Sequence, residues 1–243
     1  LVYVLNGRGT TNVSGFRLSN VGALAPIDGS TRPLSAAATA PAQLEFSPDG
    51  RVLVVTEKAT NRITTFTVGN DGRLTMVGAV PSATATPFGF AFDGRGYLVV
   101  SEAAGGAAGA SVLSSYDVSR AGAVTRVSAS VATTQTAACW VLLADGGRLA
   151  LTTNTGSGTV SAFAVGAGGT LTLRHAVAAN TGAGSNPLDM ALSRNGRFVY
   201  VLAPGSTSTP GTLRPYAIRD DGTLEGLGPV DGIPATAFGL AAR

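Results

Sequence analysis

The chain has 243 residues, a net charge of +3 and a sequence pI of about 9.4, and 44% of its residues are hydrophobic. This length suits one all-β domain spanning residues 1–243, and apolar residues in short runs exclude a disordered chain. The sequence also excludes a membrane helix, which needs a run of about 18 apolar residues, and its single cysteine excludes an intrachain disulfide and a multi-cysteine metal cluster.

A strand–turn–strand unit recurs along the chain. Between Pro41 and Asn61, two β-rich runs flank Asp49-Gly50, and this pattern predicts a hairpin because glycine accepts a positive φ without steric cost. The unit returns as PFGFAFDGRGYLVVSE (Pro87–Glu102), ACWVLLADGGRLALTTN (Ala138–Asn154) and PLDMALSRNGRFVYVLA (Pro187–Ala203). The chain also starts with a second strand alone, Leu1–Asn6, and ends with a first strand alone, Thr236–Arg243. We therefore count five copies, one of them split between the two ends.

Two further strands follow the hairpin in each copy. The predicted third strands are Val13–Leu18, Arg62–Val68, Ser111–Val118, Thr159–Val165 and Thr212–Ile218. The predicted fourth strands begin near Leu24, Leu74, Val124, Leu171 and Leu224, each after a turn glycine. Four strands in a repeat of about 50 residues are typical of a β-propeller. We expect five four-stranded blades and no capped helix.

The split repeat predicts how the ring closes. Thr236–Arg243 would supply the innermost strand that pairs with Leu1–Asn6, leaving no open sheet edge. The competing outcome is an open crescent that a partner completes, with self-association of the chain as one form of it.

Five segments resemble bacterial lactonase-family propellers, similar to propeller-type 6-phosphogluconolactonases and carboxymuconate cyclases. They are GRVLVVTEKATN, ATPFGFAFDGRG, TAACWV, TTNTGSG and NPLDMALSRNGRFVYVL. The resemblance covers essentially the whole chain and implies hydrolysis of a lactone. Family members generally have seven blades, so the five repeats here resemble the C-terminal five-sevenths of the family. The resemblance also implies histidine and arginine around a central pocket, but the lone His175 lies in an outer strand.

Two columns of aligned residues locate a candidate site. The first strands align Gln43, Gly89, Cys139, Asp189 and Gly239, and such a mixture of small and polar residues indicates close approach around the axis. The ends of the second strands align Asn6, Glu57, Glu102, Asn154 and Ala203, with Lys58, the only lysine, beside Glu57. We expect both columns to converge at the mouth of the channel. The alternative is that the polar tips are solvated or tie down backbone amides.

The chemistry expected there is that of an ester-type hydrolase. Glu57 or Glu102 would act as general base on water that attacks the lactone carbonyl, and Lys58 or an asparagine amide would polarise the developing oxyanion. Asn154, Gln43, Asp189 and Asn6 would bind the ligand. No cofactor is expected, although a divalent ion held by Glu57, Glu102 and Asn154 is an alternative source of an activated water.

A second functional class remains open. The same mouth could hold a sugar, a peptide or another small molecule without turnover, because fold alone does not decide function. Cys139 has no nearby histidine to activate it, which favours an inert core thiol. Charges alternate at turns without a basic cluster, so we expect a small-molecule ligand and neither nucleic acid nor membrane as partner.

Overall fold

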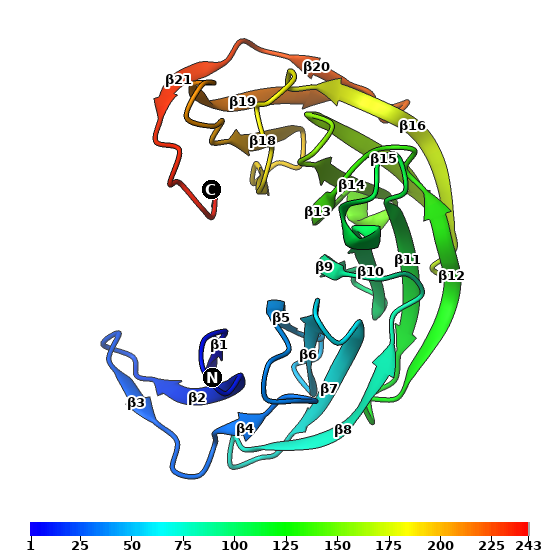
Figure 1. Ribbon diagram of the computed structural model, residues 1–243. Coiled ribbons are helices and arrows are strands. Elements are labelled where there is room, and N and C mark those ends of the chain that lie inside the picture. The colour runs from blue at the N-terminus through cyan, green and yellow to red at the C-terminus, as the bar shows by residue number, and fades with distance from the viewer. Residues whose placement is uncertain (243) are drawn as a thin grey trace.

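The computed structural model describes residues 1–242, which form five antiparallel sheets arranged around a central axis (Figure 1). Sheet 1 contains β1 (Val2–Asn6), β2 (Asn12–Leu18), β3 (Leu24–Pro26) and β4 (Arg32–Pro33). Sheet 2 contains β5 (Pro41–Phe46), β6 (Val52–Glu57), β7 (Arg62–Val68) and β8 (Leu74–Pro81). Sheet 3 contains β9 (Pro87–Phe92), β10 (Tyr97–Glu102), β11 (Val112–Val118) and β12 (Val124–Ala132). Sheet 4 contains β13 (Ala138–Ala144), β14 (Leu149–Asn154), β15 (Thr159–Val165) and β16 (Leu171–Asn180). Sheet 5 contains β17 (Met190–Leu192), β18 (Phe198–Ala203), β19 (Gly211–Ile218), β20 (Leu224–Gly226) and β21 (Val230–Ile233).

The strand order within each sheet follows the chain, as expected for propeller blades. In sheets 2, 3 and 4 each strand pairs with the next along the sequence. In sheets 1 and 5 the outer strand is divided, because β3 and β4 both pair with β2, and β20 and β21 both pair with β19. The predicted all-β fold is confirmed. Within residues 1–242 the helical segments are two three-residue 3-10 turns, η1 (Ala104–Gly106) and η2 (Asp145–Gly147), and no helix there has the length and apolarity needed to span a membrane.

The hairpin turns form where the sequence predicts them. In sheet 2, the amide of Gly50 donates to the carbonyl of Ser47 at 2.8 Å, and Gly50 adopts a φ of +69°. The carboxylate of Asp49 accepts hydrogen bonds from the Ser47 hydroxyl at 2.8 Å and the Arg51 amide at 3.2 Å. Glycine therefore supplies the left-handed conformation, and aspartate satisfies the donors around it.

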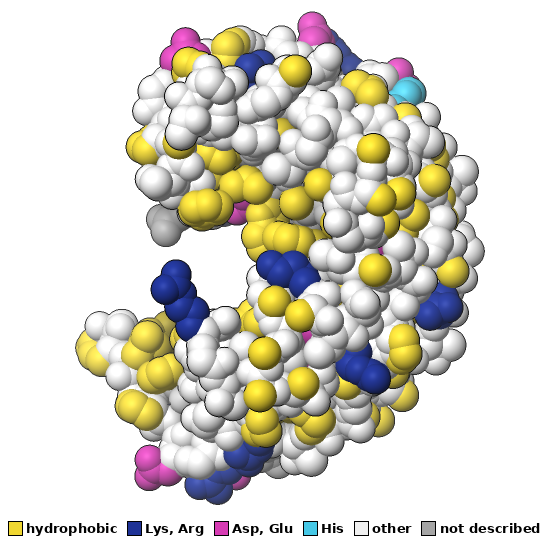
Figure 2. Space-filling model, viewed as in Figure 1, with side chains coloured by type: hydrophobic (Ala, Val, Ile, Leu, Met, Phe, Trp, Pro, Cys, Tyr) yellow, Lys and Arg dark blue, Asp and Glu magenta, His cyan; other side chains and the backbone are white. Residues whose placement is uncertain are grey.

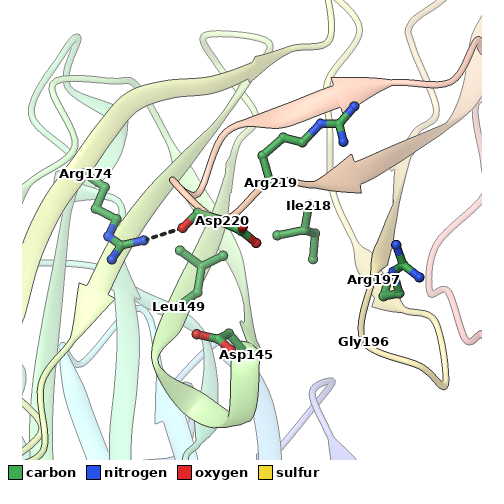
Figure 3. Close-up of a pocket in the computed structure, with 8 residues that line it drawn as sticks. All are labelled: Asp145, Leu149, Arg174, Gly196, Arg197, Ile218, Arg219 and Asp220. Atoms are coloured by element: carbon green, nitrogen blue, oxygen red, sulfur yellow. Dashed lines mark hydrogen bonds between the residues drawn. The ribbon is translucent and has the colours of Figure 1, made fainter.

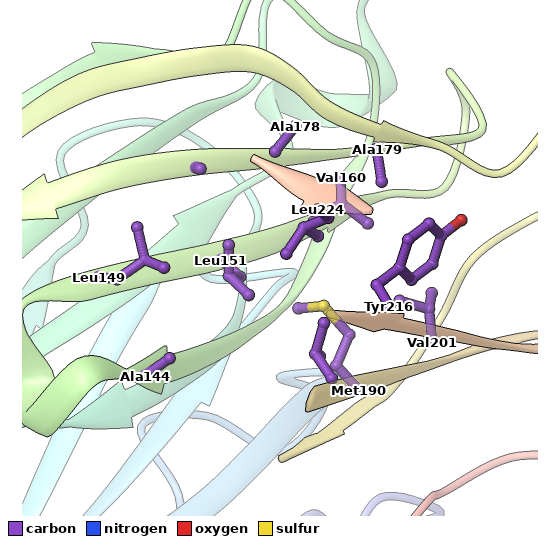
Figure 4. Close-up of a cluster of buried hydrophobic side chains, with 12 residues drawn as sticks. Ala144, Leu149, Leu151, Val160, Ala178, Ala179, Met190, Val201, Tyr216 and Leu224 are labelled. Carbon is purple, nitrogen blue, oxygen red and sulfur yellow. The ribbon is translucent and has the colours of Figure 1, made fainter. Parts of the chain in front are cut away.

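Both faces of the middle strands are buried, which explains their nearly continuous apolar sequence. In β6, Leu53 and Val55 face sheet 1, whereas Val52 and Val54 face sheet 3. A hydrophobic cluster fills each of the four interfaces between successive sheets. Figure 4 shows the cluster between sheets 4 and 5, with Leu149, Leu151 and Met190 among its members. Because side chains alternate with period two, each strand residue belongs to one interface or the other.

The predicted closure of the ring by the two chain ends is wrong for the described residues. β1 pairs only with β2, and residues 234–242 contain no strand; Arg243 lies outside the described residues. Figure 1 shows an open arc, with sheet 1 and sheet 5 on the two sides of the opening and both termini near it. Strand pairing between distant segments depends on their approach in space, so a β-rich tail alone does not ensure it. Self-association at the opening stays a prediction.

The close approach predicted around the axis is found at Gly89 in β9. A Cβ atom placed on Gly89 would lie 2.7 Å from the carbonyl oxygen of Cys139, the Cα of Trp140 and the Cε3 of Trp140. Sheets 3 and 4 therefore meet where only a hydrogen fits, which explains glycine in this column.

Replacing Gly89 with alanine should destabilise the protein by about 1–3 kcal/mol, because the added methyl group forces backbone against backbone. Gly78 in β8 is a matched control: its Cβ would meet no atom within 4 Å. Gly78→Ala should leave stability unchanged or raise it by about 0.5 kcal/mol, since glycine costs entropy in a strand. Urea unfolding measures both; equal effects of the two variants would contradict this packing.

Candidate functional site

A pocket of about 230 Å³ opens on the central axis. It is lined by Gln43 of β5, by Trp140 and Val141 of β13, and by Asp189, which precedes β17. Figure 2 shows hydrophobic side chains gathered around the axis with cationic side chains beside them. The wall of this axial pocket is thus made by the innermost strands of different sheets, which the fold alone brings together.

The chain turns sharply as it enters each of these inner segments. One residue at each entrance has a left-handed φ, between 45° and 63°, although none is glycine: Ala40, Thr86, Ala137 and Asn186. Non-glycine residues adopt this conformation at a cost, and such strain is concentrated at functional sites. The same backbone turn therefore leads into each of these four inner segments.

Gln43 connects the inner strands of sheets 2 and 3. Its Oε1 accepts the amide of Phe90 at 2.9 Å, and its Nε2 donates to the carbonyl of Phe90 at 2.8 Å. The side-chain amide thus bonds to both backbone groups of one residue, as a neighbouring strand would. Nε2 also donates to Oε2 of Glu45 at 3.1 Å. Gln43 therefore fixes the wall of the pocket and one carboxylate beside it.

Glu45 is a candidate site residue that the sequence analysis did not single out. It lies on the same side of β5 as Gln43, opposite to Leu44 and Phe46, which pack into the core between sheets 1 and 2. Burial raises the pKa of Glu45 to about 7, and the hydrogen bond from Gln43 opposes this rise. The alternation AQLEF was the signal that could have revealed it, because an acid in an inner strand faces away from the apolar residues.

An aromatic pair and a cation lie beside the pocket. The ring centroids of Phe88 and Trp140 are 5.4 Å apart, with an edge-to-face angle of 82°. The Nζ of Lys58 lies 4.6 Å from the centroid of Phe88, within cation–π range. Lys58 thus lies against the aromatic pair beside the pocket, and its role at the site stays a prediction.

Asp189 ties the end of the chain to the axis. Its Oδ1 accepts the amide of Met190 and its Oδ2 the amide of Leu240, both at 2.7 Å. Burial raises the pKa of Asp189, and these two hydrogen bonds oppose the rise. The C-terminal segment therefore returns to the axis as predicted, but through one carboxylate and not as a strand.

Cys139 is buried behind the pocket. Burial raises the pKa of its thiol, although Thr155, whose Oγ1 lies 2.9 Å from Sγ, and nearby Lys58 oppose the rise. His175 lies on β16, where its Nε2 is 3.0 Å from the carbonyl oxygen of Asp221. A protonated thiol far from this histidine favours the interpretation of Cys139 as inert.

Glu57 is fully buried and does not face the axis. Its carboxylate accepts hydrogen bonds from the amide and the hydroxyl of Ser35, from Thr60 Oγ1 at 2.7 Å and from Thr64 Oγ1 at 2.6 Å. Ser35 belongs to the loop that follows sheet 1. Glu57 therefore fastens that loop to sheet 2.

Glu102 makes the equivalent connection between sheets 2 and 3. Its two oxygens accept the amides of Ala83 and Thr84, both at 2.9 Å, and the hydroxyls of Ser114 and Tyr116, both at 2.8 Å. The side chain is fully buried. Burial raises the pKa of Glu102, and its hydrogen bonds oppose this rise.

Asparagine occupies the corresponding place in two other sheets. Asn154 is fully buried, and its Nδ2 donates to Thr159 Oγ1 at 3.1 Å and Ser161 Oγ at 2.8 Å. Asn6 donates to Asn12 Oδ1 at 2.8 Å and Ser14 Oγ at 3.1 Å. Both side chains therefore bond to the strand that follows their own in the same sheet, Asn154 to β15 and Asn6 to β2.

The predicted convergence of the two columns is wrong. Gln43 and Asp189 line the axial pocket and Lys58 lies beside it, but Glu57, Glu102, Asn154 and Asn6 bond within the sheets or their interfaces. The reason is strand periodicity: Glu57 shares a face of β6 with Leu53 and Val55, which pack against sheet 1. The side chains proposed as ligands of a divalent ion consequently lie in separate interfaces, and residues 1–242 hold no group of three metal-ligating side chains.

Changing Glu102 to glutamine should cost about 1–3 kcal/mol of stability. The side-chain NH₂ group of glutamine would replace one carboxylate oxygen and face a backbone N–H, which is also a donor. A buried donor would then have no acceptor. Exposed Glu225 gives a matched control, and Glu225→Gln should stay within about 0.5 kcal/mol of the parent. Both are measured by urea unfolding. A Glu102→Gln protein with unchanged stability and altered ligand turnover would return Glu102 to the functional site.

Comparison with known proteins gives a family resemblance over part of the chain and a shared fold. Residues 3–108 match the family model described as Lactonase, 7-bladed beta-propeller. No curated protein matches the chain. The predicted resemblance in sequence is therefore confirmed for the first part of the chain.

Several solved structures share the fold. A putative 6-phosphogluconolactonase from Bacteroides uniformis has a TM-score of 0.77 at 17% identity, covering 93% of this chain and 67% of its own. A second one, from Bacteroides fragilis, has a TM-score of 0.74 at 18% identity, with coverage of 94% and 67%. A periplasmic gluconolactonase from Pseudomonas aeruginosa has a TM-score of 0.74 at 20% identity, with coverage of 94% and 68%. The chain is a β-propeller that resembles the lactonase family, in sequence over residues 3–108 and in fold over most of its length.

Proposed function

We propose that the chain is a lactonase-like β-propeller, with its five sheets acting as blades, and that the axial pocket binds and hydrolyses a sugar-acid or related lactone. The family match and two structural neighbours, a putative 6-phosphogluconolactonase and a gluconolactonase, suggest the substrate class. The pocket has an aromatic wall in Trp140, and Lys58 and Glu45 supply a cation and a carboxylate beside it.

One observation carries the proposal: Gln43, which lines the pocket, donates a hydrogen bond to the carboxylate of Glu45, whose pKa burial raises to about 7. Glu45 bonds to Gln43 Nε2 at 3.1 Å, and Gln43 and Trp140 share the pocket wall. A general base works best when its pKa lies near the working pH. Glu45 therefore replaces Glu57 and Glu102 as the proposed general base.

The proposed reaction needs only water and the lactone. Trp140 gives the ring an apolar surface, and a water molecule attacks the carbonyl carbon while Glu45 accepts its proton. The ring C–O bond then breaks, and the ring oxygen takes up a proton to give a hydroxy acid. Lys58 supplies positive charge for the oxyanion that develops on the carbonyl.

A second candidate is a non-catalytic propeller that binds the same class of ligand. The observation that favours it is the complete engagement of Glu57 and Glu102, the bases predicted from sequence, in hydrogen bonds away from the axis. In that case the pocket keeps its aromatic wall and its cation but performs no chemistry.

Hydrolysis of δ-gluconolactone and 6-phosphogluconolactone, measured by proton release above the spontaneous rate, tests the proposal. Since Glu45 must be deprotonated to accept a proton, kcat should rise with pH and reach half of its plateau near pH 7. Glu45→Gln should lower kcat by about 100-fold or more, whereas the control Glu225→Gln should not change it.

Binding can be followed separately, because Trp140 is the only tryptophan of the chain. Its fluorescence should change when either lactone is added. A fluorescence change without turnover would favour the binding module, and full kcat in Glu45→Gln would overturn the role of Glu45.

A further inference from the structure

A second, larger pocket lies between sheets 4 and 5, at the end where the hairpin turns are. Its volume is about 540 Å³. Sheet 4 contributes Asp145, Leu149 and Arg174, and sheet 5 contributes the segments 196–197 and 218–220. None of these residues lines the axial pocket. We call this pocket the turn-side crevice.

The equivalent crevice between sheets 2 and 3 explains why this one is open. There, Asp49 in the hairpin turn of sheet 2 forms an ion pair at 3.4 Å with Arg120, which follows β11 of sheet 3. That crevice has a volume of only about 160 Å³. The corresponding residues of the turn-side crevice are Asp145 and Asp220. Two carboxylates cannot form the ion pair, so no such contact crosses the space.

Most charged groups around the turn-side crevice already have partners. Asp145 is paired with Arg148 at 2.6 Å, and Arg219 with Glu225. Arg174 Nη1 donates to the backbone carbonyl of Asp220 at 3.4 Å, which holds the rim between the two sheets.

Two lining side chains are different. Within residues 1–242, the guanidinium of Arg197 and the carboxylate of Asp220 have neither an ion pair nor a hydrogen bond. Figure 3 shows Leu149 and Ile218 between Arg174 on one side and Arg197 on the other. The crevice thus offers an unpaired donor group, an unpaired acceptor and an apolar surface between them.

We propose that the turn-side crevice binds a small hydroxylated anion, such as a sugar acid or a sugar phosphate. The planar guanidinium of Arg197 suits bidentate binding of a carboxylate or phosphate. The carboxylate of Asp220 accepts hydrogen bonds from hydroxyl groups, and Leu149 and Ile218 contact the C–H surface of the ligand. Three lining arginines against two aspartates leave one net positive charge for the anion.

Isothermal titration calorimetry with 6-phosphogluconate and inorganic phosphate tests this site. Arg197→Gln should weaken binding of both probes by about tenfold, because it removes a charge-assisted hydrogen bond. Asp220→Asn should weaken binding of 6-phosphogluconate and not of phosphate, which lacks the hydroxyl chain. Arg120→Gln, in the crevice between sheets 2 and 3, is the matched control and should change neither affinity.

The axial pocket is tested apart from this site by Lys58→Met, which removes its cation. That variant should keep the affinity of the turn-side crevice. The proposal is overturned if the protein binds neither probe, if Arg197→Gln leaves the affinities unchanged, or if Lys58→Met abolishes the binding. Because these measurements need no turnover, they stand whether or not the axial pocket hydrolyses lactones.

Discussion

The burial of both faces of the middle strands is the constraint on which the rest of the structure depends. Val52 and Val54 pack toward sheet 3 while Leu53 and Val55 pack toward sheet 1, and each such cluster holds two sheets together. A strand in this position has no solvent-facing side. Glu57 and Glu102 therefore form hydrogen bonds inside the interfaces, because a buried polar group without a partner destabilises the fold.

This constraint separates structural carboxylates from candidate functional ones. Glu57 and Glu102 end middle strands, so they enter the interfaces. Each accepts two hydrogen bonds from the loop after the preceding sheet and two from its own sheet. Inner strands instead border the axial pocket. Glu45 lies in one of them, on the face of β5 that carries Gln43, and burial raises its pKa to about 7. Glutamate thus stabilises the fold at the ends of middle strands, whereas in the inner strand β5 it is suited to acid–base chemistry.

Local sequence signals were enough to predict the strands and turns. Fourth strands begin at Leu74, Val124 and Leu171, where a turn glycine followed by β-rich residues predicts them. The direction of Glu57 needed one more step, the parity of its strand relative to Leu53, and the same step would have found Glu45. The tail could not be predicted in this way, because pairing with β1 depends on contacts between the two ends of the chain and on no local pattern.

The proposed ligand site is the axial pocket and not the ends of the middle strands. A crystal structure of the protein with gluconate, the hydrolysis product of gluconolactone, tests this most directly. We predict gluconate in contact with Trp140 and Gln43, with the hydrogen bonds of Glu57 and Glu102 unchanged. Gluconate bound to the carboxylate of Glu57 or Glu102, with the axial pocket empty, would contradict the account.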